Sequence, residues 1–372
     1  MLVVNAKRVI IISILFVITV YLVFKANSQV PESMSHTTAA YGAWQSPISA
    51  ASIFEASDNV SYLSVENNQL YFVESKASAN GKNILFKLNQ KNVAVQLTSN
   101  EVSVRSRVHE YGGRPYLVDG EDIYYSQFTD QKIYRISQNS PPEAITSEGL
   151  RYMECIADQN NNRLICVRED HRGIGEPINT LVAISLSDTY QEIILFEGTD
   201  FVSAPNLSPD GNSVAFITWS HPNMPWDDTQ LRVINFCENG SVERVNEAIQ
   251  SGNVSIKYPH YSKDGTLYFI ADFENWWTLY RIEQSSEQLK KPQQVLEEKI
   301  EINSYGIEDN DFAIIAYSKE GRDHIARVNL ITGEMANIGD AFSSADSVLV
   351  ANETVYFRAS TTSSGNAIYQ LI

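Results

Sequence analysis

Chemically versatile side chains gather in a few short segments of this 372-residue chain. Three of these segments place a histidine close to a carboxylate, in the pairs His109 and Glu110, His171 and Asp170, and His221 and Asp227. Imidazole and carboxylate groups together could bind a metal ion or carry out acid–base chemistry. No fixed ligand spacing supports such a cluster, so histidines hydrogen-bonded within loops are the favoured interpretation.

Nucleophilic catalysis finds no support in the sequence. No Gly-x-Ser-x-Gly elbow occurs, no strand–turn–helix unit is available to expose one, and no glycine-rich loop could hold a phosphate. The three cysteines, Cys155, Cys166 and Cys237, lack the Cys-x-x-Cys spacing of a metal site. We therefore expect no catalytic residue, no metal ligand and no cofactor in this chain.

The elements that must position these segments form a paired strand signal that recurs seven times. A turn rich in Asp, Asn or Gly precedes each short apolar run, and the runs begin at Leu70, Ile123, Leu164, Val214, Leu267, Phe312 and Val355. An alternating strand follows each run, with anchors at Leu85, Ile133, Leu181, Leu231, Leu279, Ile325 and Ile368. A period of roughly 40 to 50 residues, without helical segments between the copies, is typical of propeller blades.

We therefore predict an all-β, seven-bladed β-propeller of four-stranded antiparallel blades over residues 59–372. A blade cannot bury both of its faces alone, so neighbouring blades are expected to stack face to face. The Asp-Gly and Asn-containing turns allow tight hairpins between strands. A single β-sandwich is the alternative, but sandwiches do not repeat at a fixed period this many times.

An uncharged, apolar stretch over residues 9–24 follows Lys7 and Arg8 and predicts one N-terminal hydrophobic helix that acts as an export signal. Residues 1–28 are either a cleaved signal peptide or a membrane anchor, and residues 29–58 form a tether and lead-in segment. A buried core helix is the alternative. The propeller is expected to be periplasmic or anchored to the cytoplasmic membrane, and to meet the membrane only through this segment.

Composition narrows the classes of partner. The net charge is −17, and the calculated pI is about 4.8. Nucleic acids and anionic membrane surfaces both require a basic footprint, so neither is an expected partner. With 43% hydrophobic residues the chain can fill the cores between blades, and one propeller uses nearly its whole length.

Cys155 and Cys166 flank the turn at Asn160 and Asn161 at equal distances along the chain. They therefore face each other across a predicted hairpin. An oxidising compartment would permit a cross-strand disulfide, and two reduced, packed thiols are the alternative.

Segments rich in unusual residues fall where first strands begin or second strands end. These are residues 105–113 and 258–261 at first-strand starts, and 169–179, 219–228 and 272–277 at second-strand ends. Both kinds of position belong to one face of the disc, so all five should meet at one rim and form a contact surface. Purely structural roles for Trp276 and Trp277 are the alternative. The residues predicted to bind a ligand or partner are Arg105, Arg107, His109, Glu110, Tyr111, Glu169, Asp170, His171, Glu176, Asn179, His221, Asn223, Trp226 and Asp227.

These loop sequences resemble the N-terminal propeller of the prolyl oligopeptidase family, in its acylaminoacyl-peptidase or dipeptidyl-aminopeptidase-like branch. The resemblance is carried by residues 41–48, 107–113, 166–171 with 175–177, 219–227, 264–269 and 275–281. In that family the propeller caps a C-terminal α/β-hydrolase domain and gates peptide access to it. It contributes binding residues but no member of the catalytic triad. The resemblance thus implies that this chain, which ends at Ile372, lacks the hydrolase half.

Three hypotheses of function follow. The first is a non-catalytic binding or scaffold propeller for a peptide or protein partner. The second is the propeller half of a split serine peptidase, whose α/β-hydrolase domain is a separate chain. The third is a broken gene product. In the first case Trp44, in the lead-in segment, is expected to be exposed or folded back onto the rim.

Overall fold

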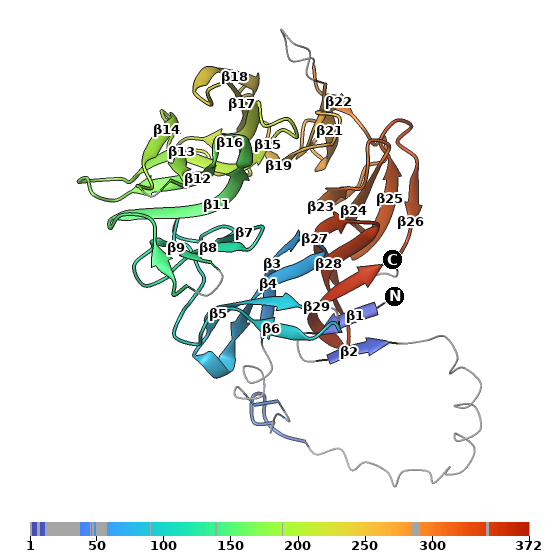
Figure 1. The fold of residues 1–372 in the computed structure, drawn as a ribbon. Helices are drawn as coiled ribbons and strands as arrows, with labels where there is room; N and C mark the ends of the chain where they lie inside the picture. The colour runs from blue at the N-terminus through green and yellow to red at the C-terminus, as the bar shows by residue number, and fades with distance from the viewer. Residues whose placement is uncertain are drawn as a thin grey trace.

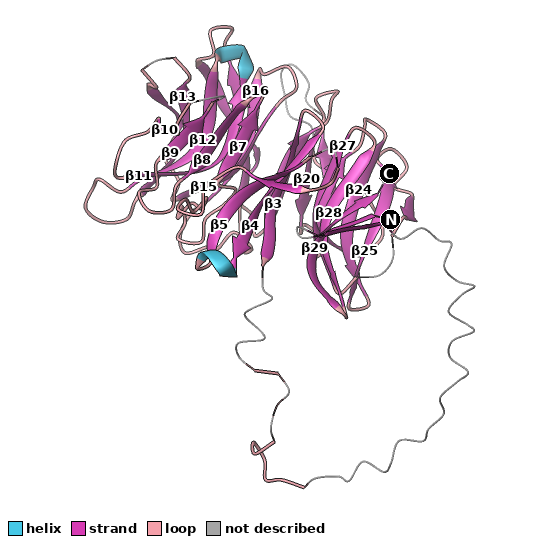
Figure 2. Ribbon diagram, turned by 60° about the horizontal axis from the view of Figure 1, so that its bottom comes forward, coloured by secondary structure: helices cyan, strands magenta, loops and turns pink. Residues whose placement is uncertain are grey.

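The computed structural model describes residues 2–5, 8–11, 38–44, 46, 48–49, 58–89, 91–137, 140–187, 189–283, 291–339 and 342–371. Within these residues the chain forms β-strands and two short 3₁₀ helices, Ala77–Ala79 and Gln159–Asn161, and no α-helix (Figure 2). The strands form seven sheets arranged around a ring, and the colour of the chain runs once around it (Figure 1). The predicted seven-bladed propeller is confirmed.

Blades one to six are four-stranded antiparallel sheets whose strands follow one another in the chain, and blade seven is a five-stranded sheet that combines the last three strands of the chain with two from its start. The first three blades contain β3 (Asn59–Glu66), β4 (Gln69–Lys76), β5 (Lys82–Leu88) and β6 (Ala94–Gln96); β7 (Tyr116–Asp119), β8 (Asp122–Ser126), β9 (Ile133–Ile136) and β10 (Glu143–Ala144); and β11 (Leu150–Asp158), β12 (Arg163–Asp170), β13 (Ile178–Ser185) and β14 (Glu192–Phe196).

The remaining blades contain β15 (Phe201–Leu207), β16 (Ser213–Trp219), β17 (Gln230–Phe236) and β18 (Val242–Ile249); β19 (Ile256–Tyr261), β20 (Leu267–Ala271), β21 (Thr278–Ile282) and β22 (Gln293–Gln294); β23 (Glu301–Ile307), β24 (Phe312–Lys319), β25 (Arg322–Asn329) and β26 (Met335–Asn337); and β27 (Ser344–Ala351), β28 (Thr354–Thr361) and β29 (Ser364–Leu371). All seven predicted apolar runs lie in second strands, and all seven predicted anchors lie in third strands.

The N-terminus differs from the predicted helix. Residues Leu2–Asn5 form β1 and Arg8–Ile11 form β2, and β1 pairs with β29, with Val3 opposite Tyr369. Blade seven therefore takes its fourth strand from the start of the chain. The helix expected over residues 9–24 is wrong for residues 9–11, which are extended, and residues 12–24 lie outside the described residues. Within the described part of the chain no helix has the length and apolar character needed to cross a membrane.

Burial occurs mainly between blades. Seven clusters of buried apolar side chains occur, one at each junction between neighbouring blades. Successive residues of one strand pack against the two different neighbouring blades. In β12, Leu164 packs against blade two and Ile165 packs against blade four. This alternation follows from the two-residue period of a strand and explains why both faces of each second strand are apolar.

The ring closes between blades seven and one through side chains. Ile368 of β29 packs with Phe72 of β4, and the Arg358 guanidinium donates a hydrogen bond to the Val60 carbonyl at 3.1 Å. Asn366 also donates to the Asn59 side chain at 3.2 Å. Blade one thus packs on blade seven much as the other blades pack on their neighbours.

The innermost strands carry a β-bulge near their centres. Registers shift within β3, β11, β15, β19 and β27 at residues with positive φ, namely Tyr62, Glu154, Ala204, Tyr258 and Ser347. Their φ values lie between 52° and 55°, and none of these residues is a glycine. A bulge bends the strand and redirects one side chain, so this repeated feature shapes the wall of the central channel.

Cys155 and Cys166 form a disulfide between β11 and β12, inside the bulge of β11. Cys237 is a free, exposed thiol. The cross-strand pairing inferred from the hairpin is therefore present.

The disulfide is expected to stabilise the fold. Replacing both residues in a Cys155→Ala/Cys166→Ala variant should lower the free energy of unfolding by about 2–4 kcal/mol, because the unfolded chain loses a cross-link. Urea unfolding of both proteins measures this difference. Thiol titration of the unfolded, unreduced protein should detect Cys237 alone, and reaction of all three cysteines would contradict the disulfide.

Candidate functional site

Strand registers place most of the predicted segments at one rim. Leu150 pairs with Asp170, Asp170 pairs with Ile178, and Phe201 pairs with Trp219, so these strand ends share one edge of their blades. Residues 105–113 lead into β7 at the same edge. We call the surface formed by residues 105–113, 169–179, 219–228 and 272–277 the loop rim. Residues 258–261 are an exception, because they lie inside the innermost strand β19, where Pro259 and Tyr261 are buried.

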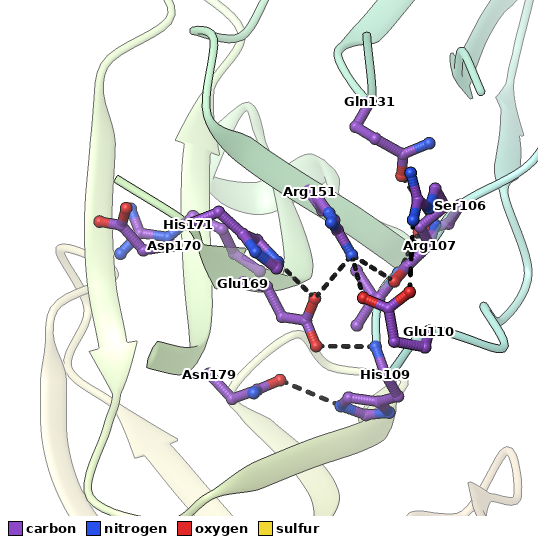
Figure 3. Close-up of polar contacts among 12 residues, drawn as sticks. Ser106, Arg107, His109, Glu110, Gln131, Arg151, Glu169, Asp170, His171 and Asn179 are labelled. Atoms are coloured by element: carbon purple, nitrogen blue, oxygen red, sulfur yellow. Dashed lines mark hydrogen bonds and ion pairs between the residues drawn. The ribbon is translucent and has the colours of Figure 1, made fainter. Parts of the chain in front are cut away.

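His109 belongs to the loop rim and is 8% exposed. Its backbone has a φ of 55°, and its backbone N–H donates a 2.7 Å hydrogen bond to Oε1 of Glu169 in blade three. The imidazole Nε2 lies 3.0 Å from Oδ1 of Asn179 on the neighbouring strand (Figure 3). Two contacts to blade three thus fix a residue that belongs to the segment before blade two.

Aromatic rings enclose the His109 imidazole. Phe201 and Trp219 of blade four meet it edge-on, with ring centroids 5.2 and 5.3 Å away, and Tyr111 lies 5.7 Å away. Burial lowers the pKa of His109 below its usual value, although the charges of Glu169 and Glu154 oppose this shift. The ring is therefore neutral at pH 7, and it joins blades two, three and four mainly by packing.

Glu169 is the buried anion of the site, with 2% of its surface exposed. Besides the His109 backbone, it binds Nε2 of His171 at 2.9 Å, and the Arg151 guanidinium lies 3.9 Å away. A buried carboxylate is stable only with such partners. The carboxylate of Glu169 therefore contacts both of the predicted residues His109 and His171.

Glu110 extends this network to the surface. Arg151 donates to Glu110 at 2.8 Å and to the Arg107 carbonyl at 3.0 Å, and Arg107 pairs with Glu110 at 3.4 Å. The hydrogen bond from Arg151, with weaker help from Arg107, lowers the pKa of Glu110 despite a small opposing effect of burial. The backbone N–H of Arg107 donates to Gln131 at 2.7 Å. Figure 3 shows these contacts as one connected set.

Other predicted residues lie apart from this network. Asp170 pairs with Arg172 at 2.6 Å, and the hydrogen bond from Arg172 lowers the pKa of Asp170 to about 2. Arg105 lies over the ring of Phe128, with its guanidinium 5.1 Å from the ring centre. The side chain of Glu176 is exposed in the loop between β12 and β13.

The blade-four loop forms its own structure next to the network. His221 binds Asp200 through its backbone N–H and its imidazole, at 2.9 and 3.0 Å. Asp227 accepts the backbone N–H of Met224 at 2.9 Å, and the backbone N–H of Asn223 donates to Ser220. Phe201 connects this loop to the first network, since its ring lies 5.0 Å from His221 and 5.2 Å from His109.

Exposed apolar side chains project from this rim. Tyr111 is 60% exposed and Trp226 is 62% exposed, and large exposed surfaces also belong to Ile174, Ile178, Met224, Phe273 and Trp276. In contrast, the opposite rim connects first and second strands through tight turns such as residues 67–68, 120–121 and 352–353. Trp44 of the lead-in segment is exposed.

The three histidines do not share a ligand. His109 binds Asn179, His171 binds Glu169, and His221 binds Asp200. Among the described residues no group of three or more His, Cys, Asp or Glu side chains is arranged to hold a metal ion. Sequence reasoning missed three organising residues, Arg151, Asp200 and Phe201, because each lies outside the unusual segments in an otherwise ordinary stretch of chain.

Comparison with known proteins identifies solved structures that share this fold. No family model and no curated protein matches the sequence. Among solved structures, puromycin hydrolase is 22% identical with a TM-score of 0.81, and a puromycin-hydrolyzing peptidase of Mycobacterium tuberculosis is 24% identical with a TM-score of 0.80. Each match covers 90% of this chain and 55% of the other chain. A prolyl endopeptidase structure is 14% identical with a TM-score of 0.64.

This chain therefore spans about half the length of the structures that it matches. It has the propeller fold found in prolyl oligopeptidase structures, as the sequence resemblance predicted. These identities establish the fold, and the activities named for the matched proteins are those of the longer chains.

Acidification should lower the free energy of unfolding, because His109 takes up a proton more readily in the unfolded state than in the folded state. The folded-state pKa of His109 is lowered, so as the pH falls through about 6.5 the unfolded state takes up a proton that the folded state does not. Stability is then lost between about pH 7 and the folded-state pKa. Urea unfolding at pH 7.5 and 5.5 should show a smaller pH-dependent loss in His109→Gln than in the parent.

A His260→Gln variant is the matched control for this prediction, because burial lowers the pKa of His260 as well. His260→Gln should retain the part of the pH dependence that comes from His109. An unchanged pH dependence in His109→Gln would contradict this assignment.

Glu169→Gln should lower the free energy of unfolding by about 2–4 kcal/mol, because it removes a buried charged acceptor from two donors. Glu176→Gln, on the exposed part of the same rim, should change it by less than about 0.5 kcal/mol. Chemical denaturation of the two variants measures both values. Equal effects would show that Glu169 does not hold the rim together.

Proposed function

We propose that this chain is a non-catalytic propeller that binds a peptide or protein partner at its loop rim. The observation that carries the proposal is the group of exposed aromatic and apolar side chains on that rim, including Tyr111 and Trp226. Exposed apolar groups that surround a fixed polar network are typical of binding surfaces. The network around Glu169 supplies the fixed support, since it holds residues from blades two and three in one geometry.

A peptide or protein is the favoured class of partner for two reasons. Solved structures with this fold include peptidases, and the sequence resemblance implies a propeller that controls peptide access. In addition, the net charge of −17 disfavours nucleic acids and anionic membrane surfaces. Chemistry is assigned to no residue of this chain, because its three rim histidines and the carboxylates of Glu110, Glu169, Asp170 and Asp227 are used in structural hydrogen bonds.

The split peptidase is the second candidate. The matched peptidase structures are longer than this chain, and 45% of the length of puromycin hydrolase lies outside the match, since the match covers 55% of it. A separate α/β-hydrolase chain seated on the loop rim would supply an equivalent of that part. Under this proposal the propeller provides binding residues and the partner provides the serine nucleophile.

An exported location is part of the proposal. The apolar stretch at residues 9–24 supports it, and so does the Cys155–Cys166 disulfide, because structural disulfides persist mainly in oxidising compartments. Cleavage after residue 28, or insertion of residues 9–24 into a membrane, would remove strands from blade seven, because β1 and β2 lie within this segment. The mass of the N-terminal peptide of the mature protein decides between a cleaved signal and a retained segment.

Affinity capture from native cells tests the proposal. Trp226→Ala should reduce recovery of the specific partner by about tenfold or more, because exposed tryptophans often dominate binding energy. Ile331→Ala is the matched control, since Ile331 is an exposed apolar residue in a turn of the opposite rim, and it should leave recovery unchanged. Equal recovery with both variants would contradict binding at the loop rim.

A fluorophosphonate probe separates the two candidates. A captured protein that reacts with the probe, and that restores peptide hydrolysis when mixed with the propeller, indicates the split peptidase. A captured protein that does not react indicates the binding or scaffold role. The purified chain alone is expected to hydrolyse no peptide, and turnover by it would contradict both.

A further inference from the structure

The outer edge of β29 is paired with the start of the chain. Residues 2–4 of β1 lie opposite residues 368–370 of β29 in an antiparallel register, and β2 then pairs with β1. Figure 1 shows β1 beside β29 in blade seven. In this structure the edge of β29 therefore holds an extended segment that is distant from it in the sequence.

This edge differs from the outer edges of the other blades. β29 has eight residues, and none of them is charged or a proline. The outer strands β6, β10, β22 and β26 have only two or three residues, and β14 has five. β18 also has eight residues, but three of them are charged. Short strands and charged side chains keep sheet edges from pairing with other chains, so β29 is the outer edge that most needs a covering strand.

Contacts on its other side hold β29 in place. Residues 364–371 of β29 pair with β28. Tyr369 is 4% exposed and stacks on Phe357, with ring centroids 5.4 Å apart, and Ile368 packs with Phe72 of blade one. Removal of β1 would therefore leave β29 in position, with backbone N–H and C=O groups on its outer edge that lack partners within the blade.

Export separates β1 from this edge. Cleavage of a signal peptide removes residues 1–28, which include β1. A retained anchor keeps Lys7 and Arg8 on the cytoplasmic side of the membrane, because positively charged flanks stay in the cytoplasm. Since β1 precedes Lys7, it would then lie on the opposite side of the membrane from β29. Either fate of the N-terminal segment leaves the edge of β29 open.

We propose that the outer edge of β29 is a strand-binding site of the exported protein, and that an extended, uncharged segment of a partner protein replaces β1 there. The sequence of β1, Leu-Val-Val-Asn, indicates the chemistry that the edge accepts, because it has no charge, no proline and two β-branched side chains. Main-chain hydrogen bonds would supply the affinity, as in other strand-addition complexes. This inference rests on the proposed exported location and is independent of the loop rim.

A fluorescent peptide with the sequence of residues 1–11 is a suitable probe. The full chain is folded with a specific protease site in place of residues 30–36 and is then cut, so that the segment before the site can dissociate. Fluorescence anisotropy should show peptide binding to the cut chain that is at least tenfold tighter than to the uncut chain, in which the tethered β1 competes. A Val3→Pro peptide should bind at least tenfold more weakly, because proline cannot donate to a strand ladder, whereas a Val3→Thr peptide should bind as the parent peptide does.

A disulfide lock tests the location of the bound peptide. Leu2 lies directly opposite Gln370, so a Leu2→Cys/Gln370→Cys variant can cross-link the two strands, and Cys237→Ser removes the free thiol. In the cut variant, oxidation should keep β1 on the edge and abolish peptide binding, and mild reduction should restore it. Equal binding by the cut and uncut chains, or by the oxidised and reduced variant, would overturn the proposal.

Two further readouts keep the outcome decisive. If the cut chain is destabilised, the peptide should raise its unfolding midpoint, and the absence of a rise would overturn the proposal. In the exported protein, slow amide exchange of a retained residue 2–5 segment would show that β1 still covers β29, which would also overturn it. Partner capture with Trp226→Ala tests the loop rim separately, so either proposal can fail without the other.

Discussion

Face-to-face packing of seven small sheets is the constraint on which the rest of this structure depends. Each second strand is apolar on both faces, so every blade needs two neighbours, and the sheets close into a ring. Bulges on the innermost strands add polar links between blades. The Tyr305 hydroxyl donates to the Tyr258 carbonyl at 2.7 Å, and Glu154 accepts the Ala204 N–H. These links fix both the channel wall and the strand ends that carry the rim.

The fixed geometry of the loop rim depends on one buried carboxylate, that of Glu169. Glu169 binds the backbone N–H of His109, whose ring is then packed between side chains of blade four. A long segment before a short first strand would otherwise have few contacts of its own. Because the anchor belongs to blade three, the segment holds its shape as a bridge between blades. Such preorganisation lowers the entropy that a partner must lose on binding.

Periodicity predicted the number of blades and the position of every second and third strand, because inter-blade burial imposes the same pattern on each copy. The bulges were not predictable, since residues such as Tyr62 and Ser347 carry no sequence mark of a positive φ. For the same reason residues 258–261 were assigned to the rim rather than to the interior of β19. The partners Arg151 and Phe201 depend on contacts between blades, and a local pattern carries no information on those. Apolar character alone also led to a predicted helix where residues 9–11 form a strand.

Hydrogen exchange of the loop rim tests most directly whether it is a preorganised surface. Peptides that cover residues 105–113 and 171–177 should be compared by mass spectrometry in the native protein. The account predicts slow exchange for the His109 amide, at a rate similar to that of the blade strands, and fast exchange in residues 172–176. Exchange of residues 105–113 as fast as that of 172–176 would contradict it, because the rim would then lack the fixed geometry on which the proposed binding depends.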